Sequence, residues 1–319
     1  MRRSANITSF FDIGTNAARM TTVKFDAKDA YQVLADKRIP TRLGENSSGN
    51  GPLSPQAIRR TVKACRRLVR FSKKTGARQI IAVATSAARE ASNRNLFLKT
   101  LERGAGIKPV VLPAQKEARL IYNAATTSAN IRTQRVLVLE IGGGTTELAL
   151  GHGRQCKSIK ILKLGAVRMK SLYPAIASRK VISEPVYQEI VEELKKLTRK
   201  QLNNLTGRPF DIVIGSAGTI LNLADIAGRV FRGRRLAAGD VVSFKQIQTI
   251  IRCLCKLPLA KRKKVPGINP DRADIIIGGA AILEAIMTLL KIRSIRASFS
   301  GLREGLIQEY MRRDASRNE

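Results

Sequence analysis

The chain has 319 residues, enough to bury a sizeable core, and this length predicts two domains rather than one. Apolar residues make up 44% of it, which indicates a globular protein and excludes a disordered basic tail. Lysine and arginine total 58 against 24 aspartate and glutamate, a formal net charge of +34. So large a surplus attracts anions, and the candidate partners are nucleic acid, anionic lipid and polyphosphate.

Scarce residue types argue against several classes of protein. The aromatic share is only 4%, with no tryptophan, which argues against base-stacking platforms for single-stranded nucleic acid. The four cysteines lack metal-ligand spacing, and the single histidine, His152, disfavours a Ser-His or Cys-His triad. No apolar run has the character of a signal peptide or the length of a membrane span, so we expect a cytoplasmic protein without membrane attachment.

Strands and helices alternate along the first half of the chain. Strands are expected over residues 7–13, 19–25, 79–84 and 109–112, and a loop rich in Gly, Asn and Ser over 44–51. One helix begins at Pro55 with Ser54 as its N-cap and buries Ile58, Val62, Cys65 and Val69. Two more helices are expected, one over residues 86–98 and one over 115–125. This alternation predicts a mostly parallel sheet.

The pattern restarts at residue 135. A buried strand over 136–141 runs into the turn Gly142-Gly143-Gly144, and a second strand follows over 147–150. A long helix over 185–205 and a strand over 211–214 come next, the latter leading into Gly215-Ser-Ala-Gly-Thr219. The order of apolar strand, acid, Ile, Gly, turn and strand repeats the order around Asp12. This weak internal repeat predicts two similar halves.

Three glycine turns follow strands, and such turns let backbone N–H groups approach phosphate oxygens. A single glycine turn is more often only a tight turn. Three of them, two with an acid at the strand end, favour a phosphate site. The candidate phosphate-binding residues in these turns are Gly14, Thr15, Asn16, Gly143, Gly144, Thr145, Ser216, Gly218 and Thr219.

Four acids could serve phosphoryl transfer to water, which requires a metal held by carboxylates and a group that orients the water. Asp12 and Glu140 lie at strand ends where a metal would be held, and Glu147 lies just past the second turn. Glu117 opens a helix. An acid at that place can also simply stabilise the helix N-terminus, so both interpretations of Glu117 stay open.

Motifs spread over nearly the whole chain carry a family resemblance. They are Asp12-Ile-Gly-Thr-Asn16, Arg42-Leu-Gly-Glu45, Leu53-Ser-Pro55, Thr85 through Arg89 to Asn93, Glu117-Ala-Arg-Leu-Ile121, Ile141-Gly-Gly-Gly-Thr-Thr-Glu147, Leu164-Gly-Ala-Val-Arg168, Gly215-Ser-Ala-Gly-Thr219, Arg272-Ala-Asp274, Gly278 and Leu302-Arg-Glu-Gly305. In this order they resemble the exopolyphosphatase and guanosine pentaphosphate phosphohydrolase (Ppx/GppA) family, in its short two-domain form.

The resemblance implies a fold and a domain organisation. The fold would be α/β, with two actin-like domains of the sugar kinase, Hsp70 and actin superfamily (ribonuclease H-like) and an interdomain cleft for the substrate. Domain I would cover residues 1–125, with a C-terminal helix of about 304–319 packing back on it. Domain II would cover residues 126–303.

The resemblance also implies roles for the site residues. Glu117 matches the glutamate that activates the attacking water, and Glu147 matches a second essential glutamate. Asp12 and Glu140 match acids near Mg²⁺, or another divalent cation such as Mn²⁺. Arg89 matches an arginine facing the phosphate chain, and the glycine turns match the phosphate loops.

Three departures from the family pattern bear on metal geometry and rate rather than on the fold. Glu140 stands where the family has Asp, so the carboxylate reaches one methylene further. Lys116 replaces the first acid of a Glu-Glu-Ala triplet. Ser298-Phe299-Ser300 replaces Ser-Asp-Gly.

Exopolyphosphatase activity is the first hypothesis, because a basic surface makes many contacts along a chain polyanion. Guanosine pentaphosphate (pppGpp) hydrolysis uses the same chemistry. A degenerate relative that only binds polyphosphate or nucleic acid could use the basic clusters at 232–235 and 261–264, and a kinase is open on fold grounds alone. The three retained acids Asp12, Glu117 and Glu147 favour an enzyme. A homodimer and the preferred chain length stay open.

Overall fold

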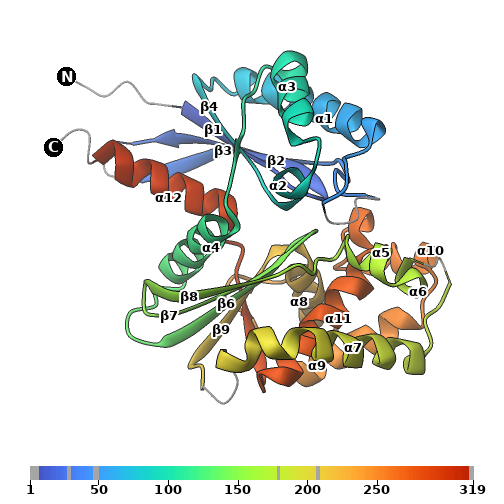
Figure 1. The fold of residues 1–319 in the computed structure, drawn as a ribbon. Coiled ribbons are helices and arrows are strands. Elements are labelled where there is room, and N and C mark those ends of the chain that lie inside the picture. Colours follow the sequence, from blue (N-terminus) through green and yellow to red (C-terminus); the bar gives the residue numbers. More distant parts are fainter. Residues whose placement is uncertain (1–6, 27–29, 46–49, 178–179, 206–208, 316–319) are drawn as a thin grey trace. The chain divides into compact units, whose positions relative to one another are not determined.

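The computed structural model describes residues 7–26, 30–45, 50–177, 180–205 and 209–315. The chain forms two compact units (Figure 1). Unit 1 comprises Met1–Leu120 with Leu302–Glu319, and unit 2 comprises Ile121–Gly301. Three expectations fall partly outside the described residues: the start of domain I at residues 1–6, the centre of the 44–51 loop, and the end of the 304–319 helix.

Unit 1 contains a five-stranded sheet in the order β3-β2-β1-β4-β5. Its strands are β1 (Ile7–Ile13), β2 (Ala17–Phe25), β3 (Tyr31–Pro40), β4 (Gln79–Ala84) and β5 (Val110–Val111). Its helices are α1 (Pro55–Lys74), α2 (Ser86–Glu90), α3 (Arg94–Ala105), the first half of α4 (Ala114–Ser128) and α12 (Leu302–Ala315). The strands β1, β2 and β3 pair antiparallel, whereas β1, β4 and β5 pair parallel. The prediction of a mostly parallel sheet was therefore wrong, because short turns join the first three strands.

Helix α1 follows its predicted pattern. Ser54 Oγ accepts a hydrogen bond from the backbone N–H of Ala57 at 3.1 Å, which satisfies one orphan donor of the first turn. The residues predicted to face inward are all buried, and they join the unit 1 core with Phe11, Leu68 and Phe97. The opposite face of the helix carries mainly charged side chains, together with the exposed Phe71.

The helix expected over 86–98 is interrupted, so that prediction was wrong in its length. Helix α2 ends at Glu90 and α3 begins at Arg94. Asn93 lies between them, and its side chain accepts from Leu53 N and donates to Leu53 O, both at 2.9 Å. These two bonds tie the connection to a distant backbone segment, a tertiary contact that competes with helix continuation.

Unit 2 contains a six-stranded sheet in the order β10-β11-β9-β6-β7-β8. Its strands are β6 (Arg135–Ile141), β7 (Thr146–His152), β8 (Gln155–Leu162), β9 (Ile212–Ser216), β10 (Val241–Ser243) and β11 (Ser294–Ala297). Its helices are α5 (Met169–Leu172), α6 (Pro174–Ala177), α7 (Glu184–Leu202), α8 (Ala217–Arg232), α9 (Phe244–Cys255), α10 (Leu259–Arg262) and α11 (Ile276–Leu289), with 3-10 segments at Asn203–Leu205 and Pro270–Arg272.

The internal repeat extends to the topology of the two sheets. In unit 1, β3, β2 and β1 pair antiparallel and β4 pairs parallel to β1. In unit 2, β8, β7 and β6 pair antiparallel in the same way, and β9 pairs parallel to β6. In each first hairpin a glycine N–H bonds across the turn, from Gly14 to Ala17 O at 3.0 Å and from Gly142 to Thr145 O at 2.9 Å. The predicted α/β class with two similar halves is confirmed, and each half holds a mixed sheet.

Helix α11 is the centre of the unit 2 core. Its residues from Ile276 to Met287 are all buried, and it packs against α7, α8 and α9. The one acid among them, Glu284, accepts hydrogen bonds from Tyr187 Oη and Gln248 Nε2, both at 2.9 Å, so its burial is compensated. In the described ranges, no helix combines the length and the apolar character needed to cross a membrane.

Candidate active site

The first glycine turn, at the end of β1, is fixed by its neighbours. Thr15 Oγ1 and Ser86 Oγ share a hydrogen bond of 2.7 Å. The carbonyl of Asn16 accepts from the backbone N–H groups of Thr41 and Arg42 at 3.0 and 2.9 Å. The Asn16 side chain is buried, and its Nδ2 has no acceptor among the described residues. A buried donor without a partner is costly, and an anion at this turn would supply one.

Asp12 lies at the next-to-last position of β1, opposite Arg19 on β2. Burial raises the pKa of Asp12; Arg19 and Arg303 lower it, and Glu304 raises it. Within the described part of the chain, the buried Oδ1 of Asp12 has no hydrogen-bond partner. Oxygen ligands of this kind suit Mg²⁺, so Asp12 fits the role of a metal ligand.

Arg89 and Glu117 form an ion pair inside unit 1. Arg89 on α2 donates from Nη1 to Glu117 Oε2 and to the carbonyl of Leu112, both at 2.8 Å. Glu117 is only 8% exposed, in the first turn of α4. Burial raises its pKa to about 7, although Arg89 lowers it; the charge of Asp12 adds to the rise. The buried Nη2 of Arg89 has no acceptor in the described ranges, so this arginine retains a donor for a ligand.

Lys116, which departs from the family pattern, forms an ion pair in the structure. Lys116 Nζ lies 3.3 Å from Glu309 Oε1 on α12, within unit 1. Its charge is therefore partly compensated by an acid other than Glu117. At 40% side-chain exposure this ion pair contributes little to stability.

Glu140 and Glu147 occupy the corresponding hairpin of unit 2, directly opposite each other on β6 and β7. Ser216 Oγ, at the end of the neighbouring β9, donates to Glu140 Oε2 at 2.8 Å. Glu147 is buried, with 3% exposure. The longer side chain at position 140 is thus held by a defined hydrogen bond.

The second glycine turn rests on the segment that follows β8. The carbonyl of Gly143 accepts from the backbone N–H groups of Val167 and Arg168 at 2.9 and 3.1 Å. A Cβ at Gly165 would lie 2.4 Å from Gly143 O, so only glycine permits this approach. The Leu164-Gly-Ala-Val-Arg168 motif thereby positions the turn that holds Gly143, Gly144 and Thr145.

The third turn opens helix α8. Ala217 has a left-handed φ of 64°, and the carbonyl of Gly215 accepts from Ser298 N at 2.9 Å. A Cβ at Gly218 would lie 2.2 Å from Arg272 Cζ, so the guanidinium lies directly against the turn. Thr219 is fully buried, and its Oγ1 has no partner among the described residues. Backbone N–H groups at such a helix start are available to an anion.

The structure groups the candidate residues into two sets, one in each unit. Unit 1 brings together Asp12, Gly14, Thr15, Asn16, Arg89 and Glu117; unit 2 brings together Glu140, Gly143, Gly144, Thr145, Glu147, Ser216, Gly218 and Thr219. Of the described His, Cys, Asp and Glu side chains, no three gather into a group that could hold a metal alone. The metal role of Asp12 and Glu140 therefore stays a prediction.

Arg303 and Asp274 lie in sequence motifs, but the sequence assigned no role to either of them. Arg303 donates to Thr21 Oγ1 at 2.8 Å and to Asp36 Oδ1 at 2.9 Å, and its charge acts on Asp12. Lys170 Nζ pairs with Asp274 Oδ2 at 2.9 Å. The family motifs contained Arg303 and Asp274, yet only the tertiary fold shows what they contact.

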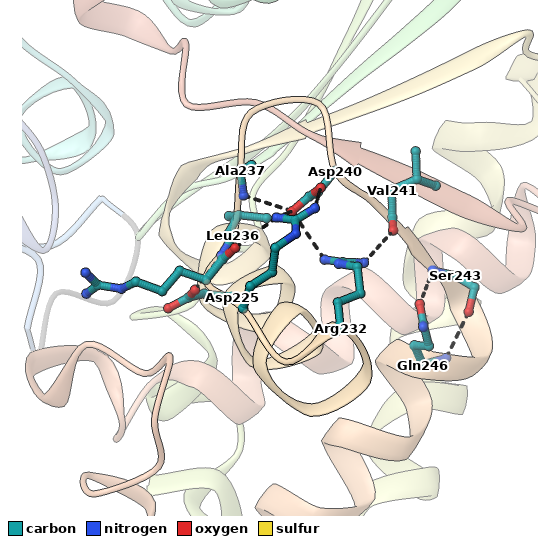
Figure 2. A network of polar contacts seen from close by, with 10 residues as sticks. Asp225, Arg232, Leu236, Ala237, Asp240, Val241, Ser243 and Gln246 are labelled. Carbon is teal, nitrogen blue, oxygen red and sulfur yellow. Dashed lines mark hydrogen bonds and ion pairs between the residues drawn. The ribbon is translucent and has the colours of Figure 1, made fainter.

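Part of each basic cluster is engaged in holding the fold. Arg232 pairs with Asp240 at 3.4 Å, as Figure 2 shows. Arg234 pairs with the same carboxylate at 2.7 Å. The hydrogen bond from Arg234 holds the pKa of Asp240 below its usual range. In the second cluster Arg262 is 1% exposed and donates to the carbonyls of Leu254, Leu257 and Ala273. These three arginines are structural, which weakens the clusters as nucleic-acid sites.

The sequence matches the Ppx/GppA phosphatase family over residues 22–314, and the chain belongs to that family. Its members are hydrolases, so the family supports phosphatase activity.

Solved structures show the same fold. The Ppx/GppA family member of Aquifex aeolicus is 24% identical, with a TM-score of 0.76 over 97% of this chain and 98% of that chain. An exopolyphosphatase from Cytophaga hutchinsonii is 19% identical, with a TM-score of 0.87 over 96% and 98%. An exopolyphosphatase-like protein is 24% identical, with a TM-score of 0.86 over 98% and 100%. The fold of the described units is therefore that of the Ppx/GppA structures.

Proposed function

We propose that this protein is an exopolyphosphatase that releases terminal phosphate from inorganic polyphosphate. The observation that carries the proposal is the buried ion pair between Arg89 and Glu117. Burial raises the pKa of Glu117 to about 7, and Arg89 Nη2 has no acceptor among the described residues. A carboxylate with a pKa near the working pH suits a general base. A guanidinium beside it suits phosphate oxygens.

In this mechanism the carboxylate of Glu117 accepts a proton from the attacking water. The water oxygen bonds to the terminal phosphorus, the bond from that phosphorus to the bridging oxygen breaks, and the shortened chain leaves with that oxygen. Arg89 Nη2 binds an oxygen of the phosphate chain, while Nη1 holds Glu117 in place at 2.8 Å. The buried Nδ2 of Asn16 and the backbone of the glycine turns bind further phosphate oxygens. Phosphoryl transfer is governed mainly by such positioning and charge stabilisation.

The proposed cofactor is Mg²⁺ or a similar divalent cation, held by Asp12 and by Glu140, directly or through water. When bound, it would neutralise charge on the phosphate chain. The support within this chain is the buried Asp12 Oδ1, which has no hydrogen-bond partner in the described ranges. Glu147 is proposed as the second catalytic glutamate, on its burial and its family motif.

Hydrolysis of pppGpp is the alternative within the same chemistry. The charge of +34 favours polyphosphate, because a long polyanion gains from many cationic contacts. A binding protein without activity is disfavoured, since the acids are retained and three arginines of the two basic clusters hold the fold. The proposed compartment is the cytoplasm, as expected from the sequence.

The test is a phosphate-release assay with long polyphosphate, short polyphosphate and pppGpp side by side, with Mg²⁺ and with excess chelator. We expect release from polyphosphate that depends on the metal. Release from pppGpp alone would transfer the proposal to that substrate, and full activity in chelator would exclude the metal role.

A further inference from the structure

Helix α1 carries cations that the proposed reaction does not use. The sequence contains no Asp or Glu between Glu45 and Glu90, and α1 lies inside this stretch. Seven of its basic side chains are exposed, and we call them the α1 row: Arg59, Lys63, Arg66, Arg67, Arg70, Lys73 and Lys74.

The α1 row occupies one face of the helix. With 3.6 residues per turn, its seven positions fall within an arc of about 120°. The opposite face is buried in the unit 1 core through residues such as Ile58, Val62 and Leu68. From Arg59 to Lys74 the helix advances about 22 Å. The row is therefore a line of positive charge and not a scatter of solvated side chains.

The described acidic side chains leave the α1 row uncompensated. None of its seven members forms an ion pair with a described acid, although Arg66 Nε donates to the carbonyl of Gly104 at 2.7 Å. Arg60, on the same helix but outside the row, pairs with Glu45 at 3.2 Å. Helix α7 differs, since four glutamates accompany its cations and Lys195 pairs with Glu192 at 2.7 Å.

The charge spacing of the row matches a linear polyanion. Seven cations over the row give one charge per about 3.7 Å of helix. One strand of a nucleic acid carries one charge per about 3.4 Å of axis. A polymer with one charge on each link can thus neutralise the row along its length. The aromatic share of 4% offers little for stacking bases, so phosphate groups are the recognisable chemistry.

The row also begins close to the first glycine turn. Arg60 donates to the carbonyls of Thr41 and Arg42, and Arg42 N donates to the carbonyl of Asn16 at 2.9 Å. Arg59, the first member of the row, directly precedes Arg60 on α1. A chain that ends at the Asn16 turn can therefore continue onto this helix.

We infer that the α1 row is a docking surface for the distal part of a long polyphosphate chain. The inference rests on the proposed function for the choice of polyanion. The row holds the chain by many phosphate contacts while its terminal phosphate reacts elsewhere in the protein. Short substrates do not reach it.

The test is a pair of charge-matched variants in the Glu117→Gln background. The row variant carries Lys63→Gln, Arg67→Gln, Arg70→Gln and Lys74→Gln. The control variant carries Lys196→Gln, Arg199→Gln, Lys200→Gln and Lys245→Gln, which are exposed on α7 and α9. Each loses four charges. Circular dichroism verifies that both are folded, and binding of long and short polyphosphate is measured across a salt series.

We expect the row variant to lose at least tenfold in affinity for long polyphosphate at low salt. Its salt slope should fall by about 3, since each lost contact to a single-stranded polyanion removes about 0.7. Short polyphosphate should bind it as before, and the control should stay within threefold of the parent. Equal losses in both variants, or an unchanged row variant, would overturn the docking surface.

Two further measurements, duplex RNA binding and phosphate release by the wild type, separate this inference from a nucleic-acid surface and from a failure of the proposed function. A row variant that loses duplex RNA binding but keeps polyphosphate binding would overturn the inference in favour of a nucleic-acid surface. If the wild type releases no phosphate from polyphosphate, the proposed function fails. A row-specific loss of polyphosphate binding would still support the docking surface in that case.

Discussion

Glu117 is the residue on which the proposed chemistry depends. We expect Glu117→Gln to lower kcat by about a hundredfold to ten-thousandfold, the usual effect of removing a general base. Polyphosphate binding should be largely kept, because Gln has nearly the same shape. The matched control is Glu102→Gln, an exposed glutamate of unit 1 with 52% side-chain exposure, which should leave kcat unchanged. Turnover of Glu117→Gln within a few-fold of the wild type would exclude this role.

The pH dependence follows from the same carboxylate. Burial raises the pKa of Glu117 to about 7, and a general base must be deprotonated to act. The rate should therefore rise with pH through about 7 and level off above it. Arg89 lowers this pKa, so Arg89→Gln should move the midpoint upward while also weakening binding. The measurement is kcat/KM against pH for both proteins. A midpoint that stays fixed in Arg89→Gln would contradict the electrostatic link.

The main departure from the family pattern, Glu140 in place of Asp, can be tested by substitution. Its carboxylate accepts from Ser216 Oγ at 2.8 Å, a bond that a shorter Asp would lose. A hydrogen bond to a charged group such as this carboxylate is worth about 1.5–3 kcal/mol. We therefore expect Glu140→Asp to raise the Mg²⁺ concentration for half-maximal activity several-fold, and Ser216→Ala to act in the same direction. A lower requirement in Glu140→Asp would instead mean that the longer side chain is a handicap.

At the scale of elements, local patterns predicted those whose signals lie within one segment. β1 and β4 and the start of α1 were predicted correctly, because alternation, burial and an N-cap are local. β3 and β8 were missed, since they bury almost no residues and therefore lack an alternating pattern. Their pairing comes from neighbouring strands. The break at Asn93 was also missed, because Leu53, its partner, lies 40 residues away.

Helix α1 offers a prediction about stability. Like charges four residues apart destabilise a helix by about 0.2–0.5 kcal/mol each. The row variant removes four such contacts, so at low salt we expect it to be more stable than the wild type by about 1 kcal/mol. The control variant should gain less, since it removes two repulsions, Lys195–Arg199 and Lys196–Lys200, and loses the attraction of Lys196 to Glu192. Thermal unfolding at low and high salt measures the difference. A row variant less stable than the control at low salt would contradict this account.

At the scale of the whole molecule, the sequence predicted the two similar halves and the division of acids between them. The repeated order of strand, acid and glycine turn is visible in the sequence because each copy is contiguous. The Arg89–Glu117 pair and the Ser216–Glu140 bond were not predictable from local pattern, since their partners are 28 and 76 residues apart. Their residues were found as family motifs, whereas their contacts required the fold.

The net charge of +34 distinguishes the two leading substrates. Each phosphate neutralised by a cation releases counterions, so the logarithm of affinity falls with the logarithm of salt in proportion to the number of contacts. Long polyphosphate should therefore bind Glu117→Gln more tightly than short polyphosphate, and with a steeper salt slope. A pppGpp enzyme would contact only the few phosphates of its site and show a shallow slope for every ligand. If the charge serves only solubility, long and short chains should show the same slope. Isothermal titration with both lengths and with pppGpp, over a salt series, measures these slopes; equal values for the two lengths would leave substrate choice to the site alone.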